Sequence, residues 1–134
     1  MKQRVIVSAL VCKDNSYLFI EQNKVGGAYP GTLHIPGGGL EIGEDPVDAI
    51  KRELSEEVNI TVRNVRPFDF DADVVDYRGE STQLVFLRFL ADYESGTPKA
   101  GSDASRILWL DKDSLRNYPH NPPSIRLLTK LKLL

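Results

Sequence analysis

Three glutamates near the middle of the chain have the residue type and spacing of a cation-binding site. Glu56 and Glu57 follow Glu53 by three and four residues, so on a helix the three carboxylates fall within about 100° of arc. Like charges at this spacing destabilise a helix by a few tenths of a kcal/mol per pair. We therefore expect a cation over this face. Carboxylate oxygens favour Mg²⁺, with Mn²⁺ as the alternative.

The helix that must position these carboxylates is predicted from its ends and from its apolar residues. Asp45 is suited to cap the N-terminus, and Pro46 suits the first helical position. Ala49 shares the carboxylate face, and its small side chain leaves room for a cation. Asn59 stands where a left-handed residue ends a helix. The face expected to pack consists of Val47, Ile50, Leu54 and Val58.

Residues before and within this helix complete the pattern. The three glycines at 37–39 allow the backbone to approach a ligand closely. Glu44 can turn back toward the same cation or pair with Arg52. Arg52 precedes Glu56 by four residues and can hold that carboxylate in place. The alternative for the acidic residues is a solvated helix face, which leaves the spacing of Gly38, Glu44 and Arg52 unexplained.

The stretch 38–60 resembles the signature of the Nudix hydrolase family, which is Gly-x5-Glu-x7-Arg-Glu-hydrophobic-x-Glu-Glu-x-Gly-hydrophobic. One position departs, because Asn59 replaces the final glycine. Asparagine also adopts positive φ, so we expect a small loss of stability and no loss of activity. The matching residues are Gly38, Glu44, Arg52, Glu53, Leu54, Glu56, Glu57 and Ile60.

The resemblance implies an enzyme in which water attacks a phosphorus atom of a diphosphate linkage with the help of Mg²⁺. It makes Glu56 and Glu57 the main metal ligands and Glu53 a further ligand or the general base. A backbone carbonyl near Gly37 or Gly38 completes the metal shell, and Glu44 pairs with Arg52 or reaches a second metal. In some family members the base lies outside the signature. The candidates here, each otherwise a plain surface acid, are Asp92, Glu94 and Asp103.

Substrate binding requires donors for phosphate and a flat surface for the base. Arg4 is a candidate for phosphate, and its alternative role is a salt bridge at the surface. Tyr29, Phe68 and Phe70 are candidates for stacking on a base, although aromatic residues on strands are also typical of a core. The row Asp69, Asp71 and Asp73 is expected to be a solvated strand face that pairs with nearby arginines.

Short segments at 1–4, 29–31, 37–39 and 126–134 resemble the NudI-type nucleoside triphosphatases within the same family. This narrower resemblance implies a preference for pyrimidine deoxynucleotides. The leading hypothesis is therefore a nucleoside triphosphate pyrophosphohydrolase that releases the monophosphate and pyrophosphate. One alternative is a pyrophosphatase of another nucleoside diphosphate derivative, such as ADP-ribose or a nucleotide sugar. The other is a catalytically silent nucleotide-binding sensor, which has no need of three repelling carboxylates.

The remaining pattern predicts strands at 5–12, 17–21, 33–35, 60–76, 82–93 and 106–110, with the strand at 82–93 placed centrally. Loops are expected at 23–31 and 94–105. A helical turn follows Asp111, and Ser124 is expected to cap a last helix that packs through Ile125, Leu128 and Leu131. This order of elements predicts an α/β/α sandwich with a mixed β-sheet flanked by helices, as the Nudix resemblance also implies.

Length and composition bound the remaining possibilities. The chain of 134 residues suits a single Nudix domain over 1–134, and its net charge of −2 gives no reason to expect binding to a nucleic acid polymer or a membrane. No apolar run reaches the roughly 20 residues of a membrane span, and we expect no signal peptide. The single cysteine, Cys12, fits the cytoplasm. His34 and His120 lack zinc-site spacing. The expected partner is a small nucleotide bound by a monomer or homodimer.

Overall fold

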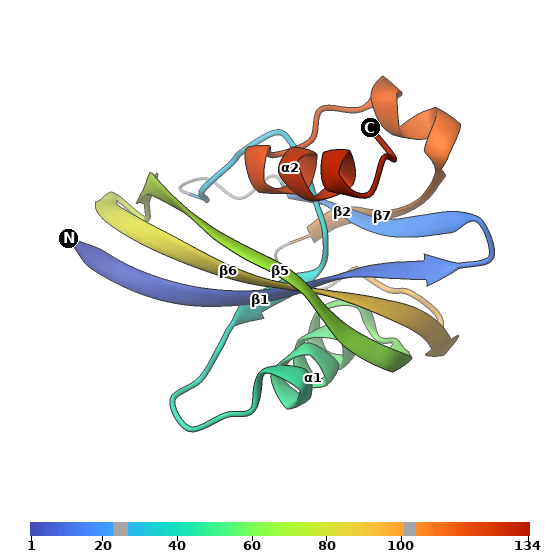
Figure 1. The fold of residues 1–134 in the computed structure, drawn as a ribbon, viewed down its shortest axis with the longest axis horizontal. Coiled ribbons are helices and arrows are strands. Elements are labelled where there is room, and N and C mark those ends of the chain that lie inside the picture. Colours follow the sequence, from blue (N-terminus) through green and yellow to red (C-terminus); the bar gives the residue numbers. More distant parts are fainter. Residues whose placement is uncertain (23–26, 101–103) are drawn as a thin grey trace.

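A mixed β-sheet with one α-helix on each face forms the frame of the chain (Figure 1). The computed structural model describes residues 1–22, 27–100 and 104–134. The sheet order is β3-β2-β1-β6-β5, with β4 added to β1 and β7 added to β2. This arrangement confirms the predicted α/β/α sandwich. The elements are β1 (Lys2–Lys13), β2 (Ser16–Gln22), β3 (Leu33–His34), β4 (Gly37–Gly39), α1 (Pro46–Val58), β5 (Thr61–Tyr77), β6 (Glu80–Ser95), β7 (Ala104–Asp111), the 3₁₀ helix η1 (Lys112–Asn117) and α2 (Pro122–Lys130).

Strand β1 organises the sheet, because it pairs with three other strands. Along one edge it runs parallel to β6, from Lys2 opposite Thr82 to Cys12 opposite Asp92. Along the other edge it pairs with the glycines of β4 near its start and with β2 only at its end. The β2–β7 pair therefore diverges from β1, and a cavity opens beside the β4 glycines.

The core lies on both faces of the sheet. On the α1 side, Ile50, Leu54 and Val58 are fully buried, and Val47 packs at the edge of the same cluster, as predicted. The expectation that Ala49 leaves room for a cation was wrong. Ala49 is fully buried among these residues and does not border space for a cation. The cluster on the α2 side consists of Leu10, Phe19, Leu33, Ile35, Leu110, Leu115, Leu127 and Leu128.

Strand β5 has the predicted alternation, but the face turned toward the protein carries its carboxylates. Phe70 is 76% exposed and Val74 is 58% exposed, whereas Asp69 and Asp71 are partly buried beneath α2. The reason is Arg88 on the neighbouring strand β6, which is 1% exposed and bonds both carboxylates. A buried arginine requires paired anions, and this requirement decides which face of the edge strand turns inward.

The N-cap of helix α2 lies three residues before the position expected for it. Its N-cap is Asn121, whose Oδ1 accepts a hydrogen bond from the Ser124 backbone N–H at 2.8 Å. Ser124 therefore lies inside the first turn and is not the cap. The helix turns Leu127 and Leu128 to the core, which leaves Ile125 42% exposed and corrects its assignment to the packing face.

Other boundaries differ by a few residues. Strand β6 continues to Ser95, so Glu94 lies in a strand and not in a loop. The helical turn predicted after Asp111 is present as η1, with the Asp111 carboxylate accepting from the Ser114 N–H at 2.9 Å. Asp103 lies outside the described residues, as do parts of both predicted loops. Neither α-helix of the described chain has the length and apolar character to cross a bilayer.

Candidate active site

Both ends of α1 are fixed by the residues that the sequence predicts for them. The Asp45 carboxylate accepts hydrogen bonds from the Val47 and Asp48 backbone N–H groups at 3.0 and 3.2 Å. At the other end Asn59 adopts the left-handed conformation, with φ of 59° and ψ of 41°. Within this frame α1 carries Glu53, Glu56 and Glu57 along one face, beside the glycines of β4.

Arg52 holds the acidic residues of the site together. Its Nε and Nη2 donate to the two carboxylate oxygens of Glu44 at 2.7 and 2.9 Å. Its Nη1 donates to Glu53 at 2.9 Å and to Glu56 at 3.3 Å. The hydrogen bond from Arg52 lowers the pKa of the Glu44 carboxyl below its usual value. Glu44 therefore pairs with Arg52, which is one of the two roles predicted for it. Glu44 and Arg52 together position the carboxylates of Glu53 and Glu56.

The glycine loop packs directly on the carboxylates of α1. A Cβ atom on Gly38 would overlap the carboxyl group of Glu53, so any other residue at this position would displace that carboxylate. The Gly37 N–H donates to Glu57 Oε2 at 3.4 Å. Arg52 Nη2 also donates to the Gly39 carbonyl at 3.2 Å, which ties the same loop to the helix. These contacts explain why the signature combines glycine with glutamate.

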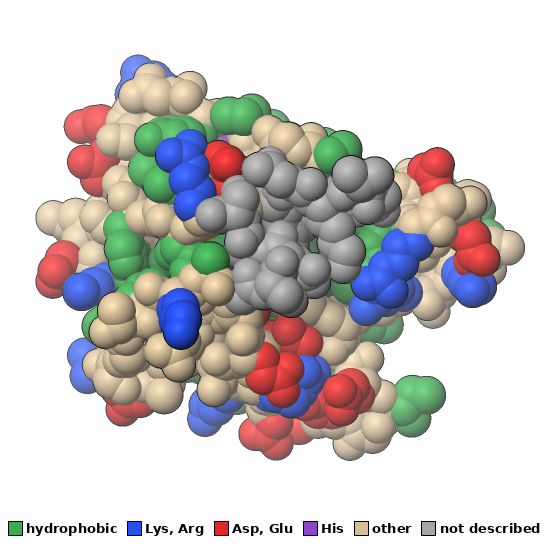
Figure 2. Space-filling model, turned by 180° about the vertical axis from the view of Figure 1, so that it is seen from behind, with side chains coloured by type: hydrophobic (Ala, Val, Ile, Leu, Met, Phe, Trp, Pro, Cys, Tyr) green, Lys and Arg blue, Asp and Glu red, His purple; other side chains and the backbone are tan. Residues whose placement is uncertain are grey.

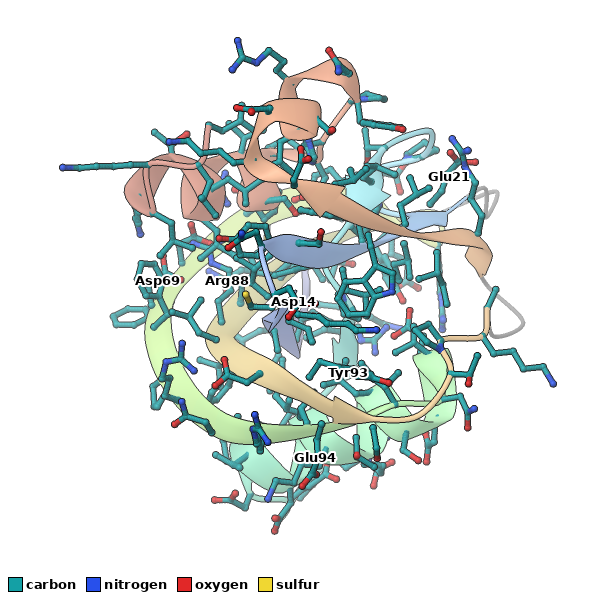
Figure 3. All side chains as sticks on the ribbon, turned by 90° about the vertical axis from the view of Figure 1, so that its right-hand side faces the viewer. Asp14, Glu21, Asp69, Arg88, Tyr93 and Glu94 are labelled. Atoms are coloured by element: carbon teal, nitrogen blue, oxygen red, sulfur yellow. The ribbon has the colours of Figure 1, made fainter. Side chains whose placement is uncertain are left out.

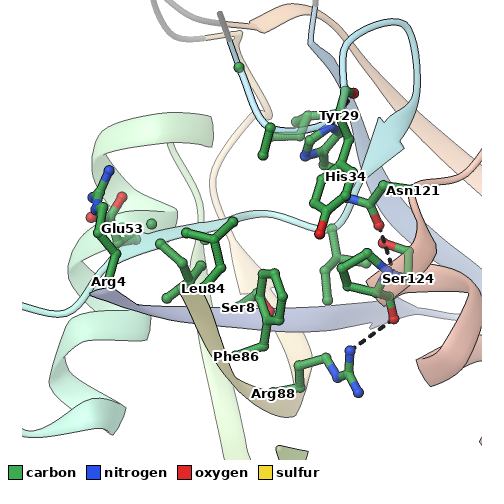
Figure 4. A pocket seen from close by; sticks show the side chains of 18 of the residues that line it. Arg4, Ser8, Tyr29, His34, Glu53, Leu84, Phe86, Arg88, Asn121 and Ser124 are labelled. Carbon is green, nitrogen blue, oxygen red and sulfur yellow. Dashed lines mark hydrogen bonds between the residues drawn. The ribbon is translucent and has the colours of Figure 1, made fainter. Parts of the chain in front are cut away.

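A cavity of about 420 Å³ begins at these carboxylates and extends toward α2 (Figure 4). One end carries Glu53 and Arg4, and the other carries Tyr29, His34 and residues of α2. Seen from behind, acidic side chains gather over the α1 layer, with Lys or Arg side chains toward the β5–β6 hairpin (Figure 2). The floor and walls include Ser8, Leu84, Phe86, Arg88, Asn121 and Ser124.

The donor set suits a hard divalent cation. Glu53, Glu56 and Glu57 all line the cavity, and carboxylate oxygens are the ligands that Mg²⁺ takes. Across residues 1–22, 27–100 and 104–134, no group of three or more Asp, Glu, His or Cys side chains is already arranged to hold a metal ion. Arg52 accounts for this, because it draws Glu53 and Glu56 toward itself. Glu53 and Glu56 therefore direct an oxygen atom each at the guanidinium of Arg52.

The far end of the cavity contains Tyr29, one of the predicted stacking residues. Its hydroxyl donates to Asp73 Oδ2 at 2.6 Å, and its carbonyl accepts from Thr32 Oγ1 at 2.7 Å. Burial and the hydrogen bond to Asp73 raise the pKa of the Tyr29 hydroxyl. The neighbouring His34 lies 3.2 Å from the Tyr29 carbonyl through Nε2, and burial lowers the pKa of its imidazole. Tyr29 is therefore a neutral, fixed wall.

Several predicted residues are not brought to the cavity. Phe70 lies on the face of β5 that is turned away from it and is exposed, so it does not form an aromatic wall. Phe68 packs against the core on the α2 side. Asp92 and Glu94 lie near the end of β6 that is remote from Leu84, and Figure 3 shows Glu94 beside the α1 layer. Neither lines the cavity.

Arg88 is a structural residue of the cavity wall that sequence reasoning did not assign to the site. It donates to Asp69 at 2.7 and 2.9 Å, to Asp71 at 2.6 Å and to the Pro123 carbonyl at 2.9 Å. Burial acts to raise the pKa of both aspartates, but the hydrogen bonds from Arg88, Arg126 and Lys130 lower it overall. Figure 3 shows Arg88 and Asp69 side by side below α2.

Other wall residues also escaped the sequence reading. Leu84 and Phe86 precede Arg88 at every second position of β6, so period-two alternation is the signal that places all three on one face. Asn121 is 6% exposed and lines the cavity. The sequence pattern that could have identified it is Asn followed by Pro, which is typical of the start of a helix. Tyr77 and Arg78 reach the cavity from the β5–β6 turn, which carries no local signal of a site.

Comparison with known proteins finds a matching family model, related sequences and similar structures. A family model described as NUDIX domain matches residues 2–131. The nucleoside triphosphatase NudI of Escherichia coli K12 is 29% identical over 128 residues, which cover 90% of this chain and 91% of that protein. Two solved structures share the fold. The MutT NUDIX hydrolase from Burkholderia pseudomallei has a TM-score of 0.83 and 23% identity, and the alignment covers 96% of this chain and 98% of that one. The NUDIX domain of Shewanella oneidensis NrtR, solved with ADP ribose, has a TM-score of 0.78 and 14% identity over 98% and 88% of the two chains.

Proposed function

The chain belongs to the Nudix hydrolase family, and from this premise we propose that it is a Mg²⁺-dependent pyrophosphohydrolase of nucleoside triphosphates. The observation that carries the proposal is a single cavity with three glutamates at one end and apolar and aromatic walls at the other. Its volume of about 420 Å³ falls within the range of small-molecule sites. The likeness to the nucleoside triphosphatase NudI supports the same substrate class.

The proposed reaction is hydrolysis of the bond between the α- and β-phosphates. The oxygen of water forms a new bond to one of the two phosphorus atoms, and the bond from that phosphorus to the bridging oxygen breaks. The products are the nucleoside monophosphate and pyrophosphate, and the water proton passes to a base and then to solvent. Little covalent chemistry falls to the protein, so its contribution is positioning and electrostatics.

The residues divide into ligands and the groups that hold them. Glu56 and Glu57 are the proposed main metal ligands, with Glu53 as a third ligand or the general base and a carbonyl near Gly38 completing the shell. When bound, Mg²⁺ neutralises phosphate charge and lowers the pKa of a coordinated water. Arg52 orients Glu53 and Glu56 by bonding both of them, and Glu44 fixes Arg52 through two hydrogen bonds.

The nucleoside is proposed to occupy the end of the cavity between Tyr29 and Phe86. The first is a fixed aromatic wall, and the second lines the floor from β6. A preference for pyrimidine deoxynucleotides is part of the proposal and rests on the short NudI-like segments of the sequence. A cavity that fits the single ring of a pyrimidine excludes the two rings of a purine sterically. A wider cavity would distinguish the two kinds of base by only ~1–3 kcal/mol.

A second candidate is a pyrophosphatase of ADP-ribose or a nucleotide sugar. The observation that favours it is the ADP ribose bound in the structurally similar NrtR domain. Both candidates use the same glutamates and differ only in what lies beyond the second phosphate. A silent nucleotide sensor is less well supported, because all three glutamates and their arginine are in place.

The test is a panel of nucleoside triphosphates, nucleoside diphosphates, ADP-ribose and nucleotide sugars assayed with Mg²⁺ for monophosphate and pyrophosphate. We expect triphosphates to give the highest kcat/KM and to release pyrophosphate. The matched control is Glu57→Gln, which keeps the size of the side chain and removes one ligand charge, and which we expect to fold normally and lose most turnover. Near-normal turnover of this variant at saturating Mg²⁺ would exclude this face as the metal site.

A further inference from the structure

Two arginines from distant parts of the chain meet at one tyrosine beside the carboxylates. Arg4 on β1 and Arg78 on the β5–β6 turn have their guanidinium carbons 5.1 and 5.0 Å from the centre of the Tyr77 ring. Arg4 Nη1 also donates to the Tyr77 hydroxyl. The ring thus holds two cations close together by cation–π attraction and one hydrogen bond.

This pair lies at the carboxylate end of the cavity. All three residues line the cavity together with Gly38 and Glu53, and Figure 4 shows Arg4 beside Glu53. The backbone makes space for the guanidinium, because a Cβ atom on Gly39 would lie 2.6 Å from Arg4 Nη2. A glycine at this position therefore admits Arg4 to the edge of the proposed metal site.

Neither arginine forms an ion pair with a carboxylate in the described part of the chain. Among the residues that the structure describes, no Asp or Glu oxygen lies within 4.0 Å of the Arg4 or Arg78 guanidinium nitrogens. By contrast, Arg52 and Arg88 each bind two or more carboxylates. Two unpaired guanidinium groups that face one cavity are suited to bind an anion with several oxygens, and phosphate fits their planar forks.

We propose that Arg4 and Arg78 form a subsite for the terminal phosphate of a nucleoside triphosphate and so select triphosphates over diphosphates and ADP-ribose. This inference rests on the proposed function and adds the residues that distinguish a substrate with three phosphates from one with two. Charge supplies the reason. Three glutamates and one Mg²⁺ sum to −1, which does not attract a third phosphate. Two arginines offset this repulsion at the place where the cavity borders the carboxylates.

The experiment compares Arg78→Ala, Arg78→Lys and Arg4→Lys with the unmodified chain, using dCTP and dCDP as substrates. We expect Arg78→Ala to lower kcat/KM for dCTP by about tenfold or more, the amount of one charge-assisted hydrogen bond, and to leave the value for dCDP within about twofold. Arg78→Lys should lose less of the kcat/KM for dCTP, because lysine keeps the positive charge but lacks the planar guanidinium group. The control is Arg63→Ala, which removes an exposed arginine from the other end of β5.

A binding arm separates this subsite from the proposed hydrolysis. Calorimetry with Mg²⁺ and the α,β-methylene analogues of dCTP and dCDP measures affinity without cleavage of the α–β linkage. Tighter binding of the triphosphate analogue that is lost in Arg78→Ala supports the subsite even if dCTP is not a substrate. If Arg78→Ala lowers the affinity for both analogues equally, or for neither, the proposed subsite is wrong, whereas the proposed pyrophosphohydrolase activity is unaffected.

Discussion

The Glu44 carboxylate receives two parallel hydrogen bonds from the Arg52 guanidinium, at 2.7 Å from Nε and 2.9 Å from Nη2. The remaining nitrogen of the same guanidinium bonds Glu53 and Glu56. One arginine therefore supplies the counter-charge for the carboxylates that the metal is proposed to claim. We expect Glu44 to keep Arg52 in place if Glu53 and Glu56 turn to a metal ion.

From this relationship we predict that Glu44→Gln lowers apparent Mg²⁺ affinity by about 10- to 100-fold, the usual effect of removing a group that orients metal ligands. The measurement is activity as a function of Mg²⁺ concentration. Most of the lost rate should return at high Mg²⁺. Lys51→Ala is the control, because it changes charge on the exposed side of the same helix. A loss of rate that no Mg²⁺ concentration restores would show that Glu44 acts on the reaction itself.

Millimolar Mg²⁺ is predicted to raise the melting temperature, because binding to the folded state alone adds RT ln(1 + [L]/Kd) to the free energy of unfolding, or about 2.7 kcal/mol at 100 times Kd. Relief of repulsion among Glu53, Glu56 and Glu57 is the physical source. Thermal unfolding with and without Mg²⁺ provides the measurement. The variant with all three residues changed to Gln is the control, and an equal shift in that variant would place the effect elsewhere.

The hydrogen bond between Tyr29 and Asp73 is predicted to set substrate affinity more than turnover. Asp73 is itself held by Arg126 at 3.1 Å, so the Tyr29 ring is fixed through β5 to α2. We expect Tyr29→Phe to raise KM by a few-fold with little change in kcat, and Tyr29→Ala to raise it further and to narrow any preference for pyrimidines. If Tyr29→Ala leaves KM and base preference unchanged, the ring only packs the loop.

Base preference itself is tested by kcat/KM for dCTP, dTTP and dUTP beside dATP, dGTP and ADP-ribose. We predict higher values for the three pyrimidines. A higher value for dGTP or ADP-ribose would contradict the NudI-like assignment and leave the metal site unaffected.

Stability is predicted to fall in acid because of the aspartates that hold Arg88. The pKa of Asp69 and of Asp71 is lowered in the folded chain, so their contribution is fully present above the usual carboxyl value of 3.8 and is lost as the pH falls through the folded pKa. Urea unfolding at pH 7 and at pH 3 measures the loss.

Asp69→Ala should lower the free energy of unfolding at pH 7 by about 3 kcal/mol, because it leaves a buried arginine with one partner fewer. The same variant should also lose less stability between pH 7 and pH 3. Asp76→Ala, at an exposed position of the same strand, is the control. Equal pH dependence in the unmodified chain and in Asp69→Ala would assign the acid sensitivity to other groups.

Features that depend on neighbours in sequence were predictable. The caps of α1 at Asp45 and Asn59, the burial of Ile50 and Leu54, and the gathering of the glutamates all follow from local rules of helix geometry. The glycine loop was predictable for the same reason, although its packing against Glu53 required the structure.

Features that depend on distant partners were not predictable from the same rules. The alternation of β5 was clear, but only Arg88, which lies 19 residues from Asp69 in sequence, decides which face is buried. The cap of α2 was predicted at Ser124, but Asn121 is the cap and Ser124 is buried inside the first turn. The cavity walls come from β1, β6 and the loops, so no single stretch of sequence contains them.

The parallel pairing of β1 with β6 has a consequence for how the chain folds during synthesis. Partners in this pairing, such as Gln3 and Gln83, are 80 residues apart. The first strand made therefore has no parallel neighbour until β6 has been translated, a delay of several seconds at about 5–20 residues per second. During that time the β6 edge of its stretch from Val7 to Val11, which is buried in the folded chain, lacks its partner and is open to mispairing. A chain that stops before β6 cannot complete the central sheet, and stalled fragments of this protein should aggregate where the full chain folds.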